Sequence, residues 1–211
     1  VYKRQDDSGL VPESLREKVT AARQDGKSVK FLYTVPNYSN PSGISQSTER
    51  RREILAVADE LDLLVVEDNP YGLLNLDGDP LPTLKSMDPD NVVYLGSFSK
   101  TFAPGFRIGW VLSPSFVRDK LVLAQESATL CPPVFSQFAV SSYLAHWDWR
   151  AQVDSFINMY RIRRDTMLAS LAETMPEGTT WSHPSGGFFV WLTMPGAVSY
   201  THLTLPTNRE V

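Results

Sequence analysis

Short apolar runs alternate with stretches of helical periodicity along this chain. Apolar runs at 30–35, 63–69 and 91–96 read as strands, and the run LLVVEDN at 63–69 is nearly continuous until it ends in acidic and amide side chains. Such continuity is typical of a strand buried on both faces of a parallel sheet. A further strand is expected at 107–113.

Between these strands the apolar residues recur at helical spacing. Helices are expected over 12–24 and 114–128, and the stretch from 135 to about 175 reads as one or two long helices. Another helix begins near Ser45 or Ser47, either of which is a good N-cap residue. Because strands and helices alternate, we expect an α/β fold built on a mainly parallel sheet.

The helix that follows Ser47 has a clear two-sided pattern. Its apolar side chains face the core at helical spacing, and the charged run RRRE at 50–53 is expected to face water. The break Cys131-Pro-Pro133 later in the chain interrupts the helical pattern, and we place a change of domain between Leu130 and Trp149.

Composition narrows the class of protein. The chain has 211 residues, 42% of them hydrophobic, which is enough for the core of one or two domains. Its net charge of −4 without a basic block gives no reason to expect a nucleic-acid partner. With three scattered histidines and one cysteine, we expect no metal site and no internal disulfide.

The same features predict where the protein works. No apolar run reaches membrane-spanning length and no secretory leader is visible, so no membrane association is expected. A single cysteine suits a reducing compartment, and we therefore predict a cytoplasmic protein.

Several candidate reactive and binding side chains lie in the stretch SFSKTFAPGFRIGW, which starts directly after the run at 91–96. Lys100 lies close to the hydroxyls of Ser97 and Ser99, and Arg107 follows seven residues later. Arginine offers a forked, permanently charged partner to phosphate oxygens, and serine hydroxyls add neutral donors. An amine beside a bound phosphate points to a phosphorylated carbonyl cofactor, because amines form Schiff bases with carbonyls.

Two other segments place polar groups after predicted strands. Asp68 ends the run at 63–69 and Tyr71 follows it, at the edge where open α/β sheets bind their ligands. Asn40 lies in the turn PNYSNPSG after the run at 30–35, in an Asn-Pro pair whose peptide bond can be cis. Taken singly, Asp68 also fits a turn cap and Arg107 an ordinary surface charge.

The motifs PNYSNPSG, VVEDNPYG and SFSKTFAPGFRIGW, in this order, resemble those of fold type I enzymes that use pyridoxal 5'-phosphate (PLP). Within that group the chain is similar to class I/II aminotransferases of the 2-aminoadipate-type and multi-substrate branch. The resemblance covers about residues 6–197 and implies part of the PLP-binding large domain at 6–135. It also implies the start of a small C-terminal α+β domain at 136–197. The ends, 1–5 and 198–211, resemble translated adapter sequence and are predicted to be non-native.

The resemblance also implies roles for single residues. Lys100 is similar to the lysine that holds PLP as a Schiff base and then shuttles a proton. Asp68 corresponds to the aspartate on the pyridine nitrogen. Tyr71 and Asn40 correspond to the pair that binds the 3' oxygen of the ring, and Asn40 also touches the substrate carboxylate. We expect Phe188 to border the substrate pocket.

The phosphate cup implied by the resemblance consists of Ser97, Ser99 and Arg107. Two parts of the family pattern are missing from this sequence, which is therefore expected to be truncated at both ends. One is the N-terminal region that supplies a phosphate loop and an aromatic stacked on the ring. The other is the C-terminal arginine that grips the substrate carboxylate. This fragment alone is accordingly expected to be inactive.

Three functions are compatible with these residues. The first is an aminotransferase that moves an amino group between an amino acid and a 2-oxo acid, homodimeric in its full-length form. The second is the aminotransferase-like effector domain of a transcription regulator that binds PLP. The third is a serine acyl-transfer enzyme, because Ser97 and Lys100 match S-x-x-K. Against this third reading, no K-T-G motif follows.

Overall fold

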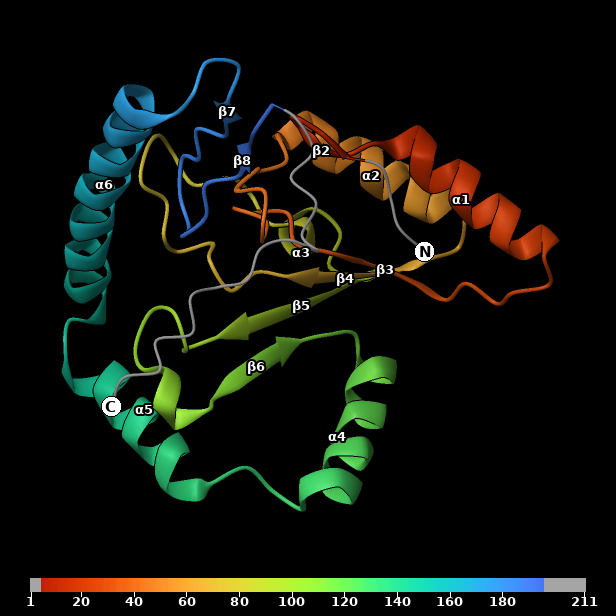
Figure 1. Ribbon diagram of the computed structural model, residues 1–211. Coiled ribbons are helices and arrows are strands. Elements are labelled where there is room, and N and C mark those ends of the chain that lie inside the picture. The colour runs from red at the N-terminus through yellow and green to blue at the C-terminus, as the bar shows by residue number, and fades with distance from the viewer. Residues whose placement is uncertain (1–4, 196–211) are drawn as a thin grey trace, which may run out of the picture.

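The computed structural model describes residues 5–195 and is built around one four-stranded sheet (Figure 1). The strands lie in the order β3 (Phe31–Thr34), β4 (Leu64–Asp68), β5 (Val92–Ser97) and β6 (Gly109–Leu112). The first three run parallel, as their continuous apolar sequences predicted, whereas β6 runs antiparallel to β5.

The sheet is mainly parallel, as predicted, and its one antiparallel pair, β5 with β6, is explained by the length of the connection. Parallel neighbours need a crossover of a dozen or more residues, usually containing an α-helix. Between β5 and β6 the chain has only a compact turn and the 3-10 helix η1 (Pro104–Phe106), so it returns beside itself as a hairpin.

The core lies on the side of the sheet that carries α1 (Pro12–Gln24) and α2 (Thr48–Glu60), which pack together over β3 and β4 (Figure 1). Both helices begin as the sequence predicted. Proline occupies the first turn of α1, and the hydroxyl of Ser47 caps α2 by accepting a bond from the Arg50 amide at 3.2 Å. Members of the core cluster include Leu15, Val19, Leu32, Ile54, Val57, Val65, Leu84 and Val92.

The prediction that the whole charged run of α2 faces water is wrong for Arg51. Its side chain is fully buried and donates to the backbone carbonyls of Gln46 at 2.9 Å and Pro82 at 2.8 Å. Helical spacing alone did not reveal this, because a polar loop rather than an apolar surface covers this face of the helix. The Arg50 side chain is only 18% exposed and forms an ion pair with Asp6 at 3.1 Å, whereas Arg52 and Glu53 face water as predicted.

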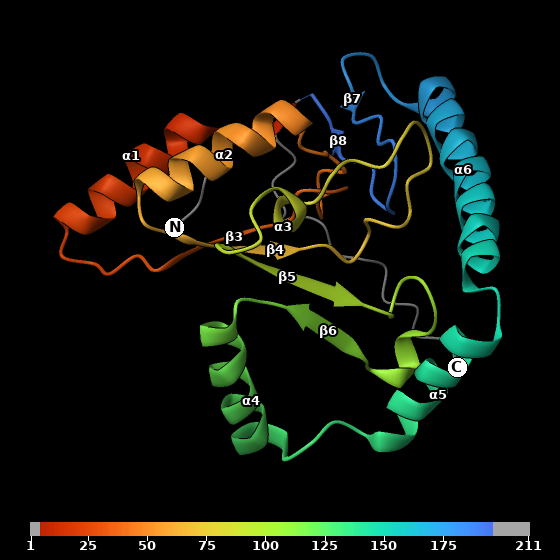
Figure 2. The same ribbon diagram turned by 180° about the vertical axis from the view of Figure 1, so that it is seen from behind.

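The second half of the described chain is mostly helical. It contains α4 (Ser115–Thr129), α5 (Val134–His146) and the long α6 (Trp149–Thr174), so the stretch from 135 forms two helices (Figure 2). Every residue of α4 is partly or fully exposed, and α6 stands at the far end of the sheet, next to the final segment of the described chain.

Smaller elements complete the fold. They are β1 (Gln5–Asp6) with β2 (Gly9–Leu10), α3 (Leu84–Met87), and the antiparallel pair β7 (Thr180–Trp181) and β8 (Leu192–Thr193). None of the helices in the described part is long and apolar enough to cross a bilayer. Of the ends predicted to be non-native, all but Gln5 lie outside the described residues. That prediction, like the division at residue 135, stays a prediction.

Candidate active site

The carboxyl ends of β3, β4 and β5 meet at one edge of the sheet, and each is followed by a segment that the sequence singled out. Parallel strands open their carboxyl ends to the same edge, which is where open α/β sheets bind ligands. The turn with Asn40 follows β3, Asp68 ends β4 with Tyr71 just beyond it, and Lys100 follows β5.

The hairpin between β5 and β6 holds the residues predicted to bind phosphate. Ser97 pairs with Gly109, and the ladder continues with the Phe98 amide donating to the Ile108 carbonyl at 3.1 Å. The next residues along the two strands are Ser99 and Arg107, so the register sets them on opposite sides of the same turn. The Ser99 amide also donates to the Ser97 hydroxyl at 3.1 Å, which places the two serines together.

Arg107 occupies an unusual backbone position at the end of η1. Its φ of 55° is in the left-handed region, which side chains larger than glycine seldom adopt. Its guanidinium is exposed and Nη1 donates to the Pro104 carbonyl at 3.4 Å. The arginine therefore borders the hairpin with most of its donors still available. No contact with Ser97 or Ser99 is present among the described residues.

Lys100 lies on the tight turn of this hairpin, and its side chain is exposed. Its Nζ sits over the ring of Phe188, 6.0 Å from the centroid, within the usual reach of a cation–π contact. The Phe188 ring in turn meets the Tyr71 ring edge to face at 5.7 Å. The structure thus brings Lys100 and Tyr71 to the same aromatic side chain.

Tyr71 is buried and its phenol forms a hydrogen bond with the Asn40 side chain. Burial raises the pKa of the Tyr71 phenol, the charge of Asp68 raises it further, and a hydrogen bond from the Asn40 side chain opposes both effects. The Asn40–Pro41 peptide bond is cis. Asn40, Asp68 and Tyr71 therefore form one neighbourhood at the end of β4.

Asp68 has a partner that the sequence did not reveal. The Tyr33 hydroxyl of β3 donates to Asp68 Oδ2 at 2.5 Å. Burial, together with the bond to this carboxylate, raises the pKa of Tyr33 to about 12. As a tyrosine in an ordinary strand, Tyr33 carried no motif signal. Only the register between β3 and β4 shows which side chain it faces.

A buried polar network supports the same edge from the core side. Asn37, just after β3, donates to the Asn69 side chain at 2.9 Å, and the Arg51 guanidinium donates to the Asn37 side chain. Glu67 is fully buried, and its Oε2 accepts a bond from the Lys85 amide at 2.8 Å. Burial raises the pKa of Glu67 and lowers that of Arg51, while each of the two charges favours the other. The network ties the ends of β3 and β4 together.

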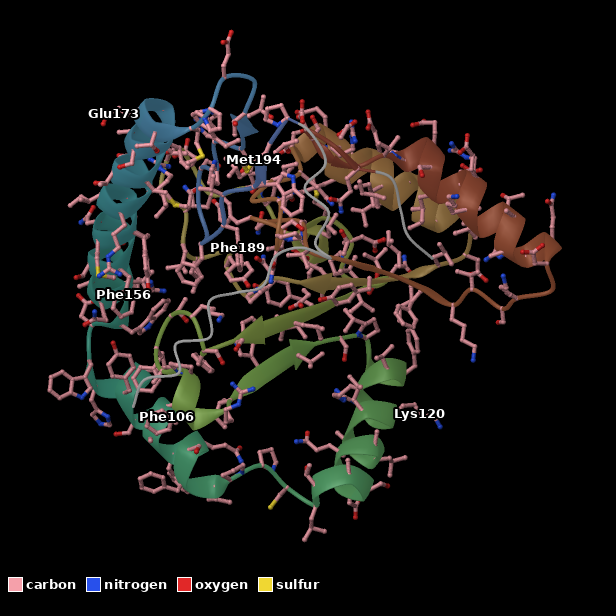
Figure 3. The ribbon with its side chains drawn as sticks, in the orientation of Figure 1. Phe106, Lys120, Phe156, Glu173, Phe189 and Met194 are labelled. Atoms are coloured by element: carbon pink, nitrogen blue, oxygen red, sulfur yellow. The ribbon has the colours of Figure 1, made fainter. Side chains whose placement is uncertain are left out.

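Phe188 reaches the site because two glycines precede it. A Cβ added at Gly186 would come within 2.3 Å of the Tyr38 ring and 2.5 Å of the Leu74 carbonyl. Gly187 has a φ of 69°, and its amide donates to Leu74 at 3.0 Å. In Figure 3 the neighbouring Phe189 points into the middle of the molecule between the sheet and α6. Residues 186–189 therefore lie tightly against the loops that follow β3 and β4.

Two arginines of α6 connect this helix to the loop after Tyr71 and to the segment that carries Phe188. Asp77, in the loop after Tyr71, forms ion pairs with Arg164 and, at 3.6 Å, with Arg161. Arg161 also donates to the Leu76 carbonyl at 2.7 Å, and Arg164 to the Pro184 carbonyl at 3.1 Å. The hydrogen bond from Arg164 lowers the pKa of Asp77. One helix thus holds the loop after Tyr71 and the segment that carries Phe188.

An apolar hollow of about 240 Å³ lies beside the hairpin, between Trp110, Phe102 and Tyr143. Ser97 borders it, but neither Lys100 nor Asp68 does, so the titratable groups of the site face elsewhere. We therefore place the candidate site at the carboxyl edge of the sheet rather than in this hollow.

The family profile described as aminotransferase class I and II matches residues 1–205. Aromatic-amino-acid aminotransferase 1 of Thermococcus litoralis is 42% identical over 195 residues, covering 92% of this chain and 46% of that protein. An uncharacterized HTH-type transcriptional regulator of Bacillus subtilis, YdfD, is 33% identical over 92% of this chain and 39% of that protein.

Among solved structures, a kynurenine aminotransferase of Pyrococcus horikoshii superposes with a TM-score of 0.90 at 39% identity. The match covers 95% of this chain and 50% of that one, whose crystals contain pyridoxamine phosphate (PMP) together with kynurenine. The chain thus spans about half the length of the curated relatives it matches.

Proposed function

Because the chain belongs to the class I and II aminotransferase family, we propose that the whole protein moves an amino group between an amino acid and a 2-oxo acid with PLP as cofactor. The observation that carries this proposal is the meeting of three segments at one sheet edge. A turn with an amide side chain follows β3, a carboxylate ends β4, and a hydroxyl-rich hairpin with an exposed amine follows β5. The PMP bound by the Pyrococcus relative supports the choice of cofactor.

The residues present fit the groups of PLP one by one. Ser97, Ser99 and Arg107 offer hydroxyl and guanidinium donors to a phosphate. Asp68 offers a carboxylate to a pyridinium nitrogen, and Lys100 an amine to an aldehyde. Every charged or polar group of the cofactor has a complementary side chain at this edge.

The pair formed by Asn40 and Tyr71 completes the set. Its hydrogen-bonding groups suit the phenolic oxygen of the ring, and the Asn40 amide is also our candidate for binding the substrate carboxylate.

When bound, PLP supplies an aldehyde that joins amines and a ring that accepts the electron pair of a breaking C–H bond. The protein's own contribution begins with Lys100, whose Nζ would take the proton from the substrate α-carbon and deliver it to the carbon that was the aldehyde carbon of the cofactor. Phe188 lies beneath that Nζ and restricts its movement without offering a competing hydrogen bond.

Asp68 would place its carboxylate against the ring nitrogen and so hold a proton there. The hydroxyl of Tyr71, kept protonated by its raised pKa, would donate to the phenolic oxygen and orient the ring.

The acyl-transfer alternative has no support in the geometry. The Ser97 hydroxyl accepts a bond from the Ser99 amide, and the family to which the chain belongs is a different one. The regulator alternative matches the same region at lower identity than the aminotransferase does, 33% against 42%, and no observation on the described residues favours it. We further propose a cytoplasmic homodimer, with the single cysteine favouring a reducing compartment.

The test is amino-group transfer by the whole protein. Loaded with PLP, it is expected to form glutamate from 2-oxoglutarate with at least one donor from a panel of dicarboxylic, aromatic and branched amino acids. Conversion of the cofactor by the donor alone, without 2-oxoglutarate, would show the first half of the reaction. Binding of PLP without transfer from any donor would contradict the proposal and favour a regulatory role.

A further inference from the structure

The Tyr33 hydroxyl and the Asp68 carboxylate meet because of the register of β3 and β4. Tyr33 pairs with Val66, and since side chains alternate between the faces of a strand, Asp68 projects from the same face one pleat further on. A tyrosine is long enough to reach that diagonal neighbour. Its hydroxyl donates to Oδ2 at 2.5 Å.

We propose that Tyr33 is a positioning residue for Asp68, fixing the carboxylate so that Oδ1 is presented to the ring nitrogen of the cofactor. This inference rests on the proposed function. Tyr33 uses one lone pair of Oδ2, whereas Oδ1 accepts no hydrogen bond from the described residues and is the oxygen we assign to the ring nitrogen. The hydroxyl also prevents the Asp68 side chain from rotating away from the site, a freedom that a half-buried carboxylate otherwise retains.

The choice of a phenol has a chemical consequence. A hydrogen bond donated to a carboxylate favours its ionised form, and a neutral donor does so without cancelling the negative charge. An arginine in this place would also fix the carboxylate, but its positive charge would neutralise the negative charge of Asp68 that stabilises the pyridinium. With a pKa of about 12, Tyr33 stays protonated at physiological pH, so its hydroxyl remains available as a donor to Asp68.

The alternative is that Tyr33 contributes only to packing on β3. Its side chain is 45% exposed, so replacing the hydroxyl by hydrogen leaves the core intact. Tyr33→Phe is therefore expected to fold normally and to separate a positioning role from a structural one. Tyr143→Phe, on α5, is a matched control that removes a phenolic hydroxyl away from Asp68.

The first experiment needs no cofactor. In the whole protein without PLP, labelled with ¹³C at the tyrosine Cζ, Asp68→Ala is expected to lower the pKa of Tyr33 from about 12. Tyr38 has a pKa of about 12 through burial and donates to Asn75 instead, so its titration is expected to stay where it is. If Tyr33 titrates identically with and without Asp68, the two groups do not interact and the proposal is overturned.

The second experiment is a double-mutant cycle on PLP affinity. Tyr33→Phe is expected to weaken PLP binding about three- to tenfold, as for the loss of a partly exposed hydrogen bond to a charge. In an Asp68→Ala background the same change is expected to have no further effect. Alanine is used because asparagine would keep a hydrogen bond. Tyr143→Phe is expected to leave the affinity unchanged in both backgrounds.

The outcomes separate this inference from the proposed function. If Asp68→Ala weakens PLP binding but Tyr33→Phe does not, or if the two losses add fully, Tyr33 is not a positioning residue and the proposed function stands. If Asp68→Ala itself leaves PLP affinity unchanged, Asp68 is not at the cofactor. The proposed site and the role of Tyr33 then fail together.

Discussion

Lys100 Nζ lies over the ring of Phe188 at 6.0 Å from its centroid, although the two residues are far apart in the sequence. The contact joins the hairpin that follows β5 to the segment after α6. A ring beneath an ammonium group limits the directions in which the group can move and excludes water from one side. The surroundings of Lys100, the lysine proposed to react, therefore include residues from both halves of the chain.

Lys100→Ala in the whole protein is expected to abolish covalent attachment of PLP and to reduce transfer by more than the 10²–10⁴-fold typical of a lost acid/base group, because the covalent step is lost as well. Borohydride reduction followed by peptide mapping is expected to label Lys100. Lys120 is the internal control, because Figure 3 shows it on α4 pointing away from the molecule. Label on Lys120 instead would refute the assignment.

Asp68→Asn is expected to slow removal of the substrate α-proton by about 10²-fold or more, while PLP affinity falls much less. Asparagine keeps the shape and a hydrogen bond, including one with Tyr33, but not the charge that holds a proton on the ring nitrogen. Single-turnover absorbance of the bound cofactor measures the rate. An Asp68 that only caps a turn would cost about 0–1 kcal/mol of stability and leave the half-reaction rate unchanged.

Gly186→Ala is expected to destabilise the protein by about 1–3 kcal/mol, since the new methyl group meets the Tyr38 ring and the rigid Leu74 carbonyl. The strain should also displace Phe188 and thereby reduce activity. Gly105→Ala is the control, because its Cβ would meet nothing within 4 Å. Urea unfolding measures both variants, and equal midpoints would show that the close approach at Gly186 is absent in solution.

Asp77 is expected to make stability depend on pH at the acid end. Its pKa in the folded chain is lowered, so its ion pairs stabilise the fold fully above the ordinary carboxyl pKa of about 4, and this contribution is lost as the pH falls from there through the lowered pKa of the folded chain. Asp77→Asn should therefore be destabilising at pH 7 and progressively less so as the pH falls below about 4, as measured by urea unfolding. Asp79→Asn, an exposed change in the same loop, is the control. A pH-independent difference for Asp77→Asn would contradict the ion pairs.

The isolated 211-residue chain is expected to self-associate, because β6 and α4 expose large apolar side chains such as Trp110, Leu112, Phe116 and Val122. Light scattering after size exclusion measures this, and the double variant Phe116→Ser/Val122→Ser should reduce association while Lys120→Ser should not. The same chain is expected to transfer amino groups poorly or not at all. A monodisperse preparation with robust transfer would overturn this view.

The sequence predicted those parts of the fold whose signals are local. The start of α1 is set by a proline, the cap of α2 by Ser47, and β4 by a continuous apolar run, and all three appear where they were expected. The motifs also place Asn40, Tyr71, Ser97 and Ser99 close to strand ends, and their roles toward a cofactor stay predictions.

What the sequence did not predict depends on contacts between distant segments. Arg51 is buried because the loop at 36–46 and Pro82 cover it, which helical spacing does not encode. Tyr33 faces Asp68 because of strand register, and Phe188 reaches Lys100 because two glycines admit a close approach. Each of these features is set by tertiary packing, which the periodicity of apolar residues along the sequence does not predict.

The β5–β6 hairpin also bears on the order of folding. Ser97 and Gly109 are near neighbours along the chain, so closing the loop between them costs little chain entropy, and hairpins of this kind form rapidly. The contacts of Phe188, by contrast, join residues that are far apart in the sequence, so they form only after a long stretch of chain has docked. The turn that carries Lys100 is therefore expected to form on the nascent protein before Phe188 docks against it. Separate spectroscopic probes on the hairpin and on Phe188 would resolve the two folding events in time.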